Sequence, residues 1–235
     1  MSVLPRLRAL GGIALDFVFP KSCLGCGREG DFICCTCLRS LPRVVPPVCP
    51  KCGRTQVNGV ICPACVRWNT DLDGIRSPFR FEGVIRQAIH ELKYRNLRSL
   101  AGRLAIFLAE YLTADPVEYD VIVPVPLHPR RLRERGYNQS ALLARELARL
   151  TGGNVMEDSV IRRQPTRPQA RTLSVQERRL NVAGAFECHG RGLADLRVLL
   201  IDDVATSAAT LDACATALKQ GGAVSVRGMT LAREM

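Results

Sequence analysis

The sequence predicts a mixed α/β protein in which a small cysteine-rich module precedes a larger domain built on a parallel sheet. Nine of the eleven cysteines fall between Cys23 and Cys65, and apolar segments of strand and helix length alternate from residue 79 onward. A chain of 235 residues is long enough for one ordinary domain and one smaller module. We therefore expect a cysteine module in residues 1–70 and the α/β domain in residues 71–235.

The clustered cysteines form four Cys-x-x-Cys pairs in a row. The tight turn within each pair presents both sulfurs to one metal ion, and two pairs complete a tetrahedral structural zinc site. Four pairs provide for one or two zinc ions, by consecutive or by crossed pairing. Consecutive pairing groups the ligands as Cys23, Cys26, Cys34 and Cys37 on one ion, and Cys49, Cys52, Cys62 and Cys65 on the other. Cys35 lies beside a ligand and is expected to be a bystander.

A disulfide framework is the alternative for these cysteines, and it requires an oxidising compartment. The regular spacing argues against it, and so does the N-terminal segment, where Asp16 interrupts the apolar run and Phe19-Pro20-Lys21 is a poor export cleavage site. We therefore expect reduced cysteines and a cytoplasmic protein. No stretch approaches the roughly 20 apolar residues of a membrane-spanning helix. The N-terminal apolar residues instead predict a short amphipathic helix: Leu4, Leu7, Ala14, Phe17 and Val18.

Hydrophobic periodicity predicts the elements of the second domain, which follow a polar linker between Cys65 and Phe79. In chain order we expect a strand at 79–81, helices at 85–92 and 97–111, a strand at 121–126, a helix at 143–150, a strand at 198–201, a helix at 211–218 and a strand at 223–231. The prolines at 124 and 126 exclude a central ladder position for the far end of their strand. Strands that alternate with helices imply a parallel sheet.

The segment from Asp202 to Thr210, at the end of a predicted strand, carries the most specific chemistry. Ligands of parallel sheets bind beyond the carboxyl ends of the strands. The adjacent carboxylates of Asp202 and Asp203 can accept hydrogen bonds from the vicinal hydroxyls of a ribose. Thr206, Ser207 and Thr210 open a helix whose free N–H groups suit a monophosphate. The plain alternative is that the acids end a strand and Thr206 caps a helix.

A second candidate loop is rich in arginine. Arg130, Arg131, Arg133 and Arg135 lie within six residues, and Gly136 allows the backbone to turn. These guanidinium groups repel one another unless an anion lies near, so the loop is expected to bind a pyrophosphate or a nucleic-acid backbone. The same site would include Tyr137, stacked on a base, together with Asn138 and Gln139. A solvated charged loop is the alternative.

The whole chain is basic, which also favours a polyanionic partner. Its net charge is +11, and 29 of its 33 cationic side chains are arginines, whose planar fork binds phosphates bidentately. A bias in codon usage would give the same composition. Further arginines lie in a polar stretch from Arg162 to Arg179, whose length is typical of a lid, a binding loop or disorder.

The segment 198–210 resembles the phosphoribosyl pyrophosphate (PRPP) motif of type I phosphoribosyltransferases, which has four apolar residues, two acids, an apolar pair, Thr-Thr-Gly, any residue and Thr. The resemblance implies a Rossmann-like parallel sheet, PRPP bound with Mg²⁺, and catalytic roles for Asp202 and Asp203. Ser207 replaces a threonine, and Ala208 replaces a glycine, which is unfavourable where φ must be positive. The residues that would bind the ribose and 5-phosphate are Asp202, Asp203, Val204, Ala205, Thr206, Ser207, Ala208, Ala209 and Thr210.

The chain as a whole resembles the ComF (competence protein F, GntX-like) family of bacterial DNA-uptake proteins. The matching features are the four cysteine pairs, the PRPP-like segment, Leu92-Lys-Tyr-Arg95, Val123 to His128 with Arg135 to Gln139, and Thr166 to Asn181, where Pro168 departs from the usual small polar residue. The resemblance implies a double zinc ribbon joined to a phosphoribosyltransferase-type domain. It also implies single-stranded DNA and the DNA-uptake machinery as partners.

Three functions remain open at this point. The chain could be an enzyme that transfers ribose 5-phosphate from PRPP to an acceptor, with Arg130 to Arg135 offsetting the charge of the departing pyrophosphate. It could instead be a PRPP sensor or a DNA-binding adaptor that retains the fold without catalysis. A gene regulator that senses PRPP is the third reading, although no helix-turn-helix pattern is present.

Overall fold

The structure is a computed structural model that describes residues 21–163, 177, 182, 184–190 and 192–235. The expected N-terminal amphipathic helix, and most of the polar stretch with Arg167, Gln169, Arg171, Arg178 and Arg179, lie outside the described residues. The chain divides into two units, Met1–Leu41 and Pro42–Met235. The first unit contains the first four-cysteine group and the short helix α2 (Cys35–Arg39).

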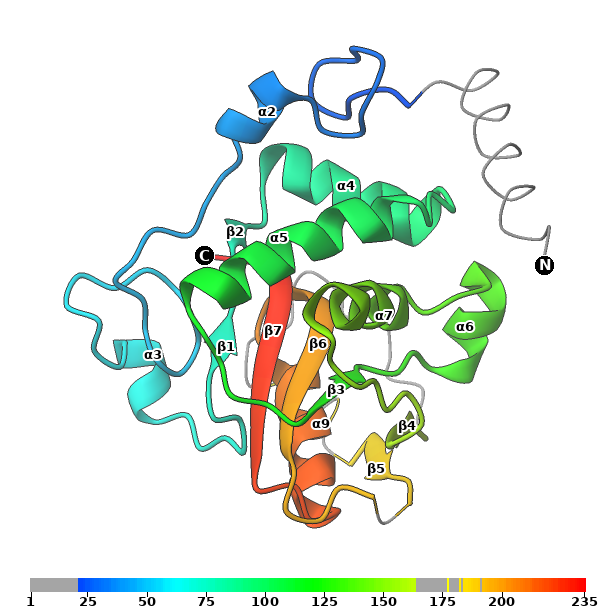
Figure 1. Cartoon of the computed structure of the whole chain (residues 1–235). Helices are drawn as coiled ribbons and strands as arrows, with labels where there is room; N and C mark the ends of the chain where they lie inside the picture. The colour runs from blue at the N-terminus through cyan, green and yellow to red at the C-terminus, as the bar shows by residue number, and fades with distance from the viewer. Residues whose placement is uncertain (1–20, 164–176, 178–181, 183, 191) are drawn as a thin grey trace. The chain divides into compact units, whose positions relative to one another are not determined.

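A parallel sheet forms the centre of the second unit (Figure 1). Its strands are β1 (Ile75–Arg76), β2 (Phe79–Arg80), β3 (Val121–Pro124), β6 (Arg197–Ala205) and β7 (Ser225–Arg233). The hydrogen-bonded order is β1-β7-β6-β3, and β2 also pairs with β7. Every pairing in this sheet is parallel, which confirms the predicted α/β fold class. β3 lies at an edge, as its prolines predict.

Helices cover both faces of this sheet. α4 (Gly83–Tyr94) packs against α5 (Leu100–Ala114), and α5 and α7 (Gln139–Thr151) lie on one face. The opposite face carries α9 (Ala209–Gln220). Beside α9 lies an antiparallel pair that the sequence did not predict, β4 (Val160–Arg162) and β5 (Phe186–Cys188). Among the described residues, no helix has both the length and the apolar character needed to cross a membrane.

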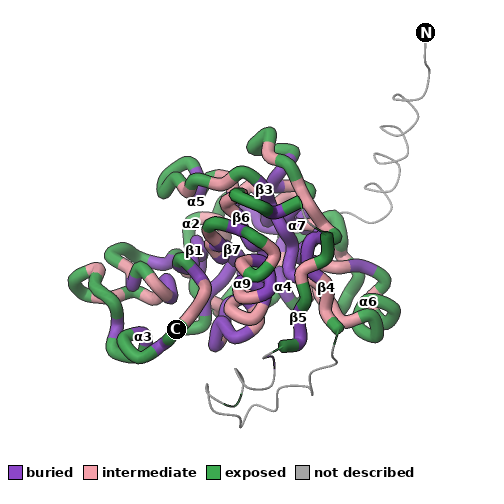
Figure 2. The backbone as a smooth tube through the Cα atoms, turned by 90° about the horizontal axis from the view of Figure 1, so that it is seen from below, coloured by how far each residue is buried: buried purple, intermediate pink, exposed green. Residues whose placement is uncertain are grey.

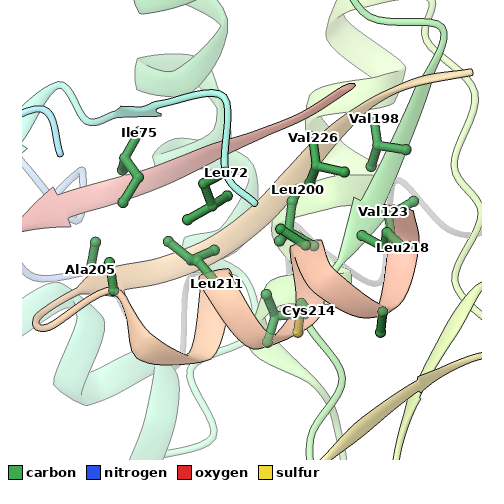
Figure 3. Close-up of a cluster of buried hydrophobic side chains, with 14 of the residues drawn as sticks. Leu72, Ile75, Val123, Val198, Leu200, Ala205, Leu211, Cys214, Leu218 and Val226 are labelled. Carbon is green, nitrogen blue, oxygen red and sulfur yellow. The ribbon is translucent and has the colours of Figure 1, made fainter. Parts of the chain in front are cut away.

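A cluster of buried hydrophobic side chains fills the space between α9 and the sheet. Leu211, Cys214 and Leu218 of α9 belong to the same buried cluster as Val198 and Leu200 of β6 (Figure 3). These positions recur at helical spacing on α9 and alternate along β6, so one apolar face of each element meets the other. Figure 2 shows the same arrangement as buried backbone along the central strands, with exposed residues in the outer turns.

The polar segment between Cys65 and Phe79, expected as a linker, is instead bound to the sheet. Leu72 and Ile75 enter the core beside α9, and Ile75 begins β1. The Asp73 carboxylate accepts a hydrogen bond of 2.7 Å from the Val226 amide, and the Asp71 carboxylate accepts one of 2.6 Å from the Thr216 hydroxyl. The polar side chains of this segment accept hydrogen bonds from neighbouring elements. The prediction of a linker from its polar composition is therefore wrong.

The arginine-rich segment, expected as a loop, forms the short helix α6 (Pro129–Arg135). His128 caps its first turn, because its Nδ1 accepts a hydrogen bond of 3.2 Å from the Arg130 amide. Gly136 ends α6 at a φ of 78°, as the predicted turn requires. The helix at 143–150 is confirmed within α7, which ends at Gly152 with a φ of 72°.

Candidate ligand cleft and metal centres

The eight predicted metal ligands form two four-cysteine clusters, which we call the first and second clusters. Within each cluster the four Sγ atoms lie within 4.8 Å of one another, and the clusters are Cys23, Cys26, Cys34 and Cys37, and Cys49, Cys52, Cys62 and Cys65. Consecutive pairing is therefore confirmed and crossed pairing is wrong. Cys35 belongs to neither cluster and is exposed.

The sulfur geometry fits zinc in both clusters. The Sγ atoms of Cys26 and Cys34 are 3.6 Å apart, and those of Cys52 and Cys62 are 3.8 Å apart. Four thiolates at about 2.3 Å from a tetrahedral zinc ion lie about 3.8 Å from one another. Because all four positions of each cluster are filled by cysteine, these sites suit closed, structural zinc and leave no position for a substrate.

The two clusters also share a hydrogen-bond pattern that favours metal binding. The amide of Cys34 donates to Cys23 Sγ at 3.3 Å, and the amide of Cys62 donates to Cys49 Sγ at 3.4 Å. Burial raises the pKa of the Cys23 and Cys49 thiols, but hydrogen bonds from backbone amides outweigh it and lower the pKa of each to about 6. Thiolates are the metal-binding form of cysteine. Gly27 and Gly53, which follow the first cysteine pair of each cluster, have φ values of 75° and 71°.

The acidic pair lies inside β6, whose ladder with β7 continues to Ala205, and not in a loop after the strand as the sequence predicted. The hydroxyl of Ser140, at the N-terminus of α7, donates to Asp202 Oδ1 at 2.8 Å. The Asp203 amide donates to the same oxygen at 2.9 Å. Asp203 is buried and forms an ion pair with Lys93 near the end of α4. Both carboxylates are therefore held in fixed positions.

The charges of this group depend on one another. Burial and the charge of Asp203 raise the pKa of Asp202 to about 7, against the opposing effects of Lys93 and Ser140. Burial lowers the pKa of Lys93, but the Asp203 carboxylate outweighs it and raises that pKa above its ordinary value. Near neutral pH, the lysine therefore stays charged while Asp202 titrates.

A cleft of about 390 Å³ opens at the carboxyl end of β6 and brings residues from six elements together. Its acids are Asp202 and Asp203, and its cations come from α4, α6 and β4. The side chains that surround the acids are Lys93, Arg131, Arg162, Gln139, Thr206 and Thr210. The structure thus joins the predicted acidic segment with one of the four clustered arginines and with the first arginine of the polar stretch.

The turn between β6 and α9 has the conformation that the PRPP motif normally assigns to glycine. Ala208 is the N-cap residue of α9 and has a φ of 63°, although its side chain is buried. The Ser207 hydroxyl accepts a hydrogen bond of 3.4 Å from the Ala209 amide. The first amides of a helix have no partner within it, so they are suited to an anion above Thr206 and Thr210.

The other three clustered arginines do not line this cleft. Arg130 pairs with Glu134 at 2.9 Å on the exposed side of α6, and Arg133 is exposed. Arg135 donates to the side-chain oxygen of Gln139, and its guanidinium lies 5.4 Å from the ring of Tyr94. The helical twist of α6 separates side chains that a loop could have gathered on one anion.

Tyr137 does not present a free face for stacking. It is buried, its hydroxyl donates to the Leu92 carbonyl, and the Arg98 guanidinium lies 4.5 Å from its ring centre. Asn138 is the N-cap of α7, where its Oδ1 accepts a hydrogen bond of 3.0 Å from the Ser140 amide. The exposed aromatic side chain here is Tyr94, which is 65% exposed and borders a second cavity of about 540 Å³ with Lys93, Arg131 and Arg135.

Sequence reasoning about chemistry missed Lys93, Tyr94 and Ser140. The first two appeared only inside the string that carried the family resemblance. One signal was present, since Lys93 is one of only four lysines among the 33 cations of the chain and follows the apolar face of a predicted helix. No local pattern indicates that this helix ends beside β6.

Known proteins are similar to this chain over most of its length. Residues 14–66 match the family model described as "Double zinc ribbon domain". DNA utilization protein YhgH of Salmonella typhimurium is 30% identical over 209 residues, which cover 86% of this chain and 91% of that protein. Competence protein ComFC of Bacillus subtilis is 27% identical over 214 residues, covering 88% and 86% of the two chains. Competence protein F of Haemophilus influenzae is 29% identical over 195 residues, covering 80% and 85%.

Two solved structures are similar over just over half of the chain. Glutamine PRPP amidotransferase from Bacillus subtilis has a TM-score of 0.38 and 22% identity, covering 56% of this chain and 26% of the other. Purine phosphoribosyltransferase from Pyrococcus horikoshii has a TM-score of 0.36 and 22% identity, covering 57% and 72%.

Proposed function

The chain belongs to the ComF family, and its relatives are named for competence and DNA utilization. We therefore propose that it acts in the uptake or use of DNA. We also propose that the cleft at the end of β6 binds PRPP. The observation that carries this second proposal is the convergence of an acidic pair, a helix N-terminus and two guanidinium groups in one cleft of about 390 Å³. These groups match the diol, the 5-phosphate and the pyrophosphate of PRPP.

Each part of the ligand has a partner in the cleft. Asp202 and Asp203 accept hydrogen bonds from the ribose hydroxyls, and the turn at Thr206 to Thr210 receives the 5-phosphate at the start of α9. Arg131 and Arg162 face the same cavity and offset the charge of the pyrophosphate. Lys93 balances the charge of Asp203, so that an anionic ligand does not meet an uncompensated acidic pair.

The carboxylates also suit the magnesium ion that accompanies PRPP. Mg²⁺ prefers oxygen ligands and is usually held by one or two carboxylates together with substrate phosphates. Asp202 and Asp203 are the carboxylates that line the cleft and would hold it with the ligand's own oxygens. The ion would supply charge neutralisation at the pyrophosphate.

Transfer to an acceptor would follow if one enters the cleft. The bond between the anomeric carbon and pyrophosphate breaks, pyrophosphate leaves with the bonding electrons, and the acceptor forms the new bond to that carbon. The carboxylates of Asp202 and Asp203 hold the sugar and stabilise the positive charge that develops on it. A non-catalytic PRPP sensor or DNA adaptor is the second candidate. It is favoured by the Lys93–Asp203 ion pair and by alanine at position 208, which has a φ of 63°.

Calorimetric titration of the zinc-loaded full chain with PRPP and Mg²⁺ tests the binding proposal. We expect the wild type to bind and Asp202→Asn combined with Asp203→Asn to lose at least about 100-fold in affinity, because two charge-assisted hydrogen bonds are removed. Absence of binding by the wild type, or unchanged affinity of the double variant, would overturn the proposal. Pyrophosphate release with candidate acceptors then separates transfer from binding alone.

Two arginines of α6 provide a matched comparison for this experiment. Arg131 lines the cleft, whereas Arg133 lies on the same helix, is exposed and does not. Arg131→Gln should weaken PRPP binding about tenfold or more, while Arg133→Gln should leave it within about twofold, because a distant surface charge is screened by salt. Equal effects of the two substitutions would show that net charge, and not the cleft, governs binding.

We propose single-stranded DNA as the nucleic-acid partner, bound beside the PRPP cleft. The supporting observation is the cavity of about 540 Å³, where the largely exposed ring of Tyr94 lies against Arg135 and beside Arg131. Aromatic faces combined with a basic groove are typical of binding to single strands. Tyr94→Ala should weaken binding about tenfold or more, and affinity should fall steeply with salt. The double aspartate variant should keep its DNA affinity; if it loses both ligands while folded, the two-site proposal is wrong.

We propose a cytoplasmic location, since thiol-ligated zinc requires reduced cysteines, and an association with the DNA-uptake machinery. We also propose residues 1–70 as a double zinc ribbon module and residues 71–235 as the phosphoribosyltransferase-type domain. Limited proteolysis of the full chain, followed by mass analysis of the stable fragments, tests this boundary.

A further inference from the structure

A buried arginine joins the phosphate-binding turn to the second cluster. Arg233, the last residue of β7, is only 2% exposed. Its Nη1 donates to the Ala205 carbonyl at 2.6 Å and also to the Thr206 carbonyl. Its Nε donates to the Cys52 carbonyl at 2.8 Å. One planar guanidinium therefore connects the backbone of a metal ligand with the turn that begins the proposed phosphate site.

The second cluster is rigidly attached to the same elements. Its four cysteines belong to the buried core that also contains Trp68, Ala208 and Leu211. On α9, the Asp212 carboxylate accepts hydrogen bonds from the Trp68 indole at 3.2 Å, the Thr70 hydroxyl at 2.5 Å and the Asp71 amide at 3.2 Å. The turn after the Cys49–Cys52 pair is also tight against β1, since a Cβ at Gly53 would lie 2.6 Å from the Ile75 carbonyl oxygen.

Arg233 is a buried cation that lies against the second cluster. A buried guanidinium is costly unless anions or carbonyls compensate it. Here the carbonyls of Cys52, Ala205 and Thr206 accept the hydrogen bonds of the buried Arg233 guanidinium. Four thiolates around one divalent zinc carry a net charge of about −2, which suits a cation held against the cluster. Loss of the metal would release the Cys52 backbone that accepts the hydrogen bond of Arg233 Nε.

We infer that Arg233 is a positioning residue that makes the shape of the turn at 205–210 depend on zinc in the second cluster. This inference rests on the proposed function, because that turn is the proposed site of the 5-phosphate. It predicts that the two zinc ions are unequal. Zinc in the second cluster is required for an ordered phosphate site, whereas zinc in the first cluster is not.

The first test compares two arginines of β7 in the full chain. Arg233→Lys keeps the charge but loses the fork that binds three carbonyls, and Arg227→Lys is the matched control on the same strand. In Arg233→Lys we expect two bound zinc ions, at least tenfold faster hydrogen exchange of amides 205–210, and PRPP binding at least tenfold weaker. The Arg227→Lys variant should match the wild type. Unchanged exchange in a folded Arg233→Lys variant would overturn the inference.

The second test compares equivalent cysteines of the two clusters. Cys34 and Cys62 are each the third ligand of their cluster, and each is 8% exposed. Cys34→Ser should leave exchange of amides 205–210 within twofold of wild type, and Cys62→Ser should raise it at least tenfold. If Cys62→Ser does not fold, zinc is removed stepwise from the wild type with a chelator instead. Exchange of amides 205–210 should then rise only when the zinc of the second cluster leaves. Equal exchange after loss of either ion would overturn the inference.

These exchange measurements need no ligand. If the wild type fails to bind PRPP, the proposed function fails, while the coupling between the second cluster and the turn is still decided by exchange.

Discussion

The two four-cysteine clusters have the same local geometry but different surroundings. In the first cluster, Cys26 is exposed and Cys37 is half-buried, and the cluster belongs to the unit Met1–Leu41. In the second cluster all four cysteines are buried in the core that carries the parallel sheet. The same motif therefore closes a small module in one place and forms part of an α/β domain in the other. The ligand spacing sets the metal site, and the residues around it set what the metal supports.

The largest expected difference between the clusters is in stability. Cys62→Ser should destabilise the second unit by several kcal/mol, because metal binding at a buried four-thiolate site is coupled to folding. Cys34→Ser should release one zinc ion and leave the main calorimetric transition near its wild-type temperature. Scanning calorimetry with zinc analysis of both variants checks this. The comparison between clusters breaks down if the two variants lose stability equally.

A smaller effect is expected when the link between the second cluster and α9 is removed. Asp212→Ala leaves the Trp68 indole, the Thr70 hydroxyl and the Asp71 amide without their shared acceptor. Unsatisfied donors of this kind cost about 2–3 kcal/mol in the free energy of unfolding. The exposed residue Glu110 on α5 supplies the control, and Glu110→Ala should change that free energy by less than about 0.5 kcal/mol. Denaturant titration measures the free energy of unfolding of both variants. If Asp212→Ala is as stable as Glu110→Ala, these hydrogen bonds do not contribute to stability.

The Asp202 carboxyl should make the free energy of unfolding of the second unit depend on pH. The pKa of Asp202 is about 7 in the folded chain and ordinarily near 3.8, so the folded state holds a proton that the unfolded state has lost. The free energy of unfolding should therefore fall as pH rises from 5 to 7.5, by about 2 kcal/mol. Asp202→Asn should remove this slope, as measured by urea unfolding at each pH. A slope that persists in the variant would assign it to another group.

The smallest expected effect concerns the turn that the second cluster supports. A left-handed alanine costs about 1–2 kcal/mol, so Ala208→Gly relieves strain that offsets the lost methyl group and the greater freedom of glycine when unfolded. We expect a net change of less than about 1 kcal/mol. Ala215→Gly, at a buried helical position on α9, should cost about 1–2 kcal/mol. Parallel denaturant unfolding of the two variants decides this, and equal losses would mean that Ala208 is not strained.

Much of the fold could be predicted because the central strands and the long helices are continuous apolar patterns. The strand expected at 198–201 lies within β6, the strand expected at 223–231 overlaps β7, and the helix expected at 97–111 overlaps α5. The pattern failed where an element is short or polar. β1 has only two residues within a polar segment, and four arginines concealed α6, whose His128 cap is not a common one.

The candidate site divides in the same way. The acids of β6 are close in sequence to Thr206 in the following turn and Thr210 in α9, so one motif predicts them together. Lys93 reaches Asp203 only because α4 ends beside the sheet, and no local pattern encodes that contact. Likewise, spacing predicted both metal clusters, but the burial of the second depends on Trp68 and on Asp212 far along the chain. The domain boundary near residue 70 stays a prediction.

The position of β7 in the sheet has a consequence for the order of events during synthesis. β7 is the last strand in the chain, yet β1, β2 and β6 all pair with it. Ribosomes release a chain from its N-terminus, so the edge strands emerge long before the strand that unites them. The ligands of the first cluster lie between Cys23 and Cys37 and can capture zinc early. Those of the second cluster emerge soon after, but the core that buries them forms only once α9 and Arg233 have been synthesised.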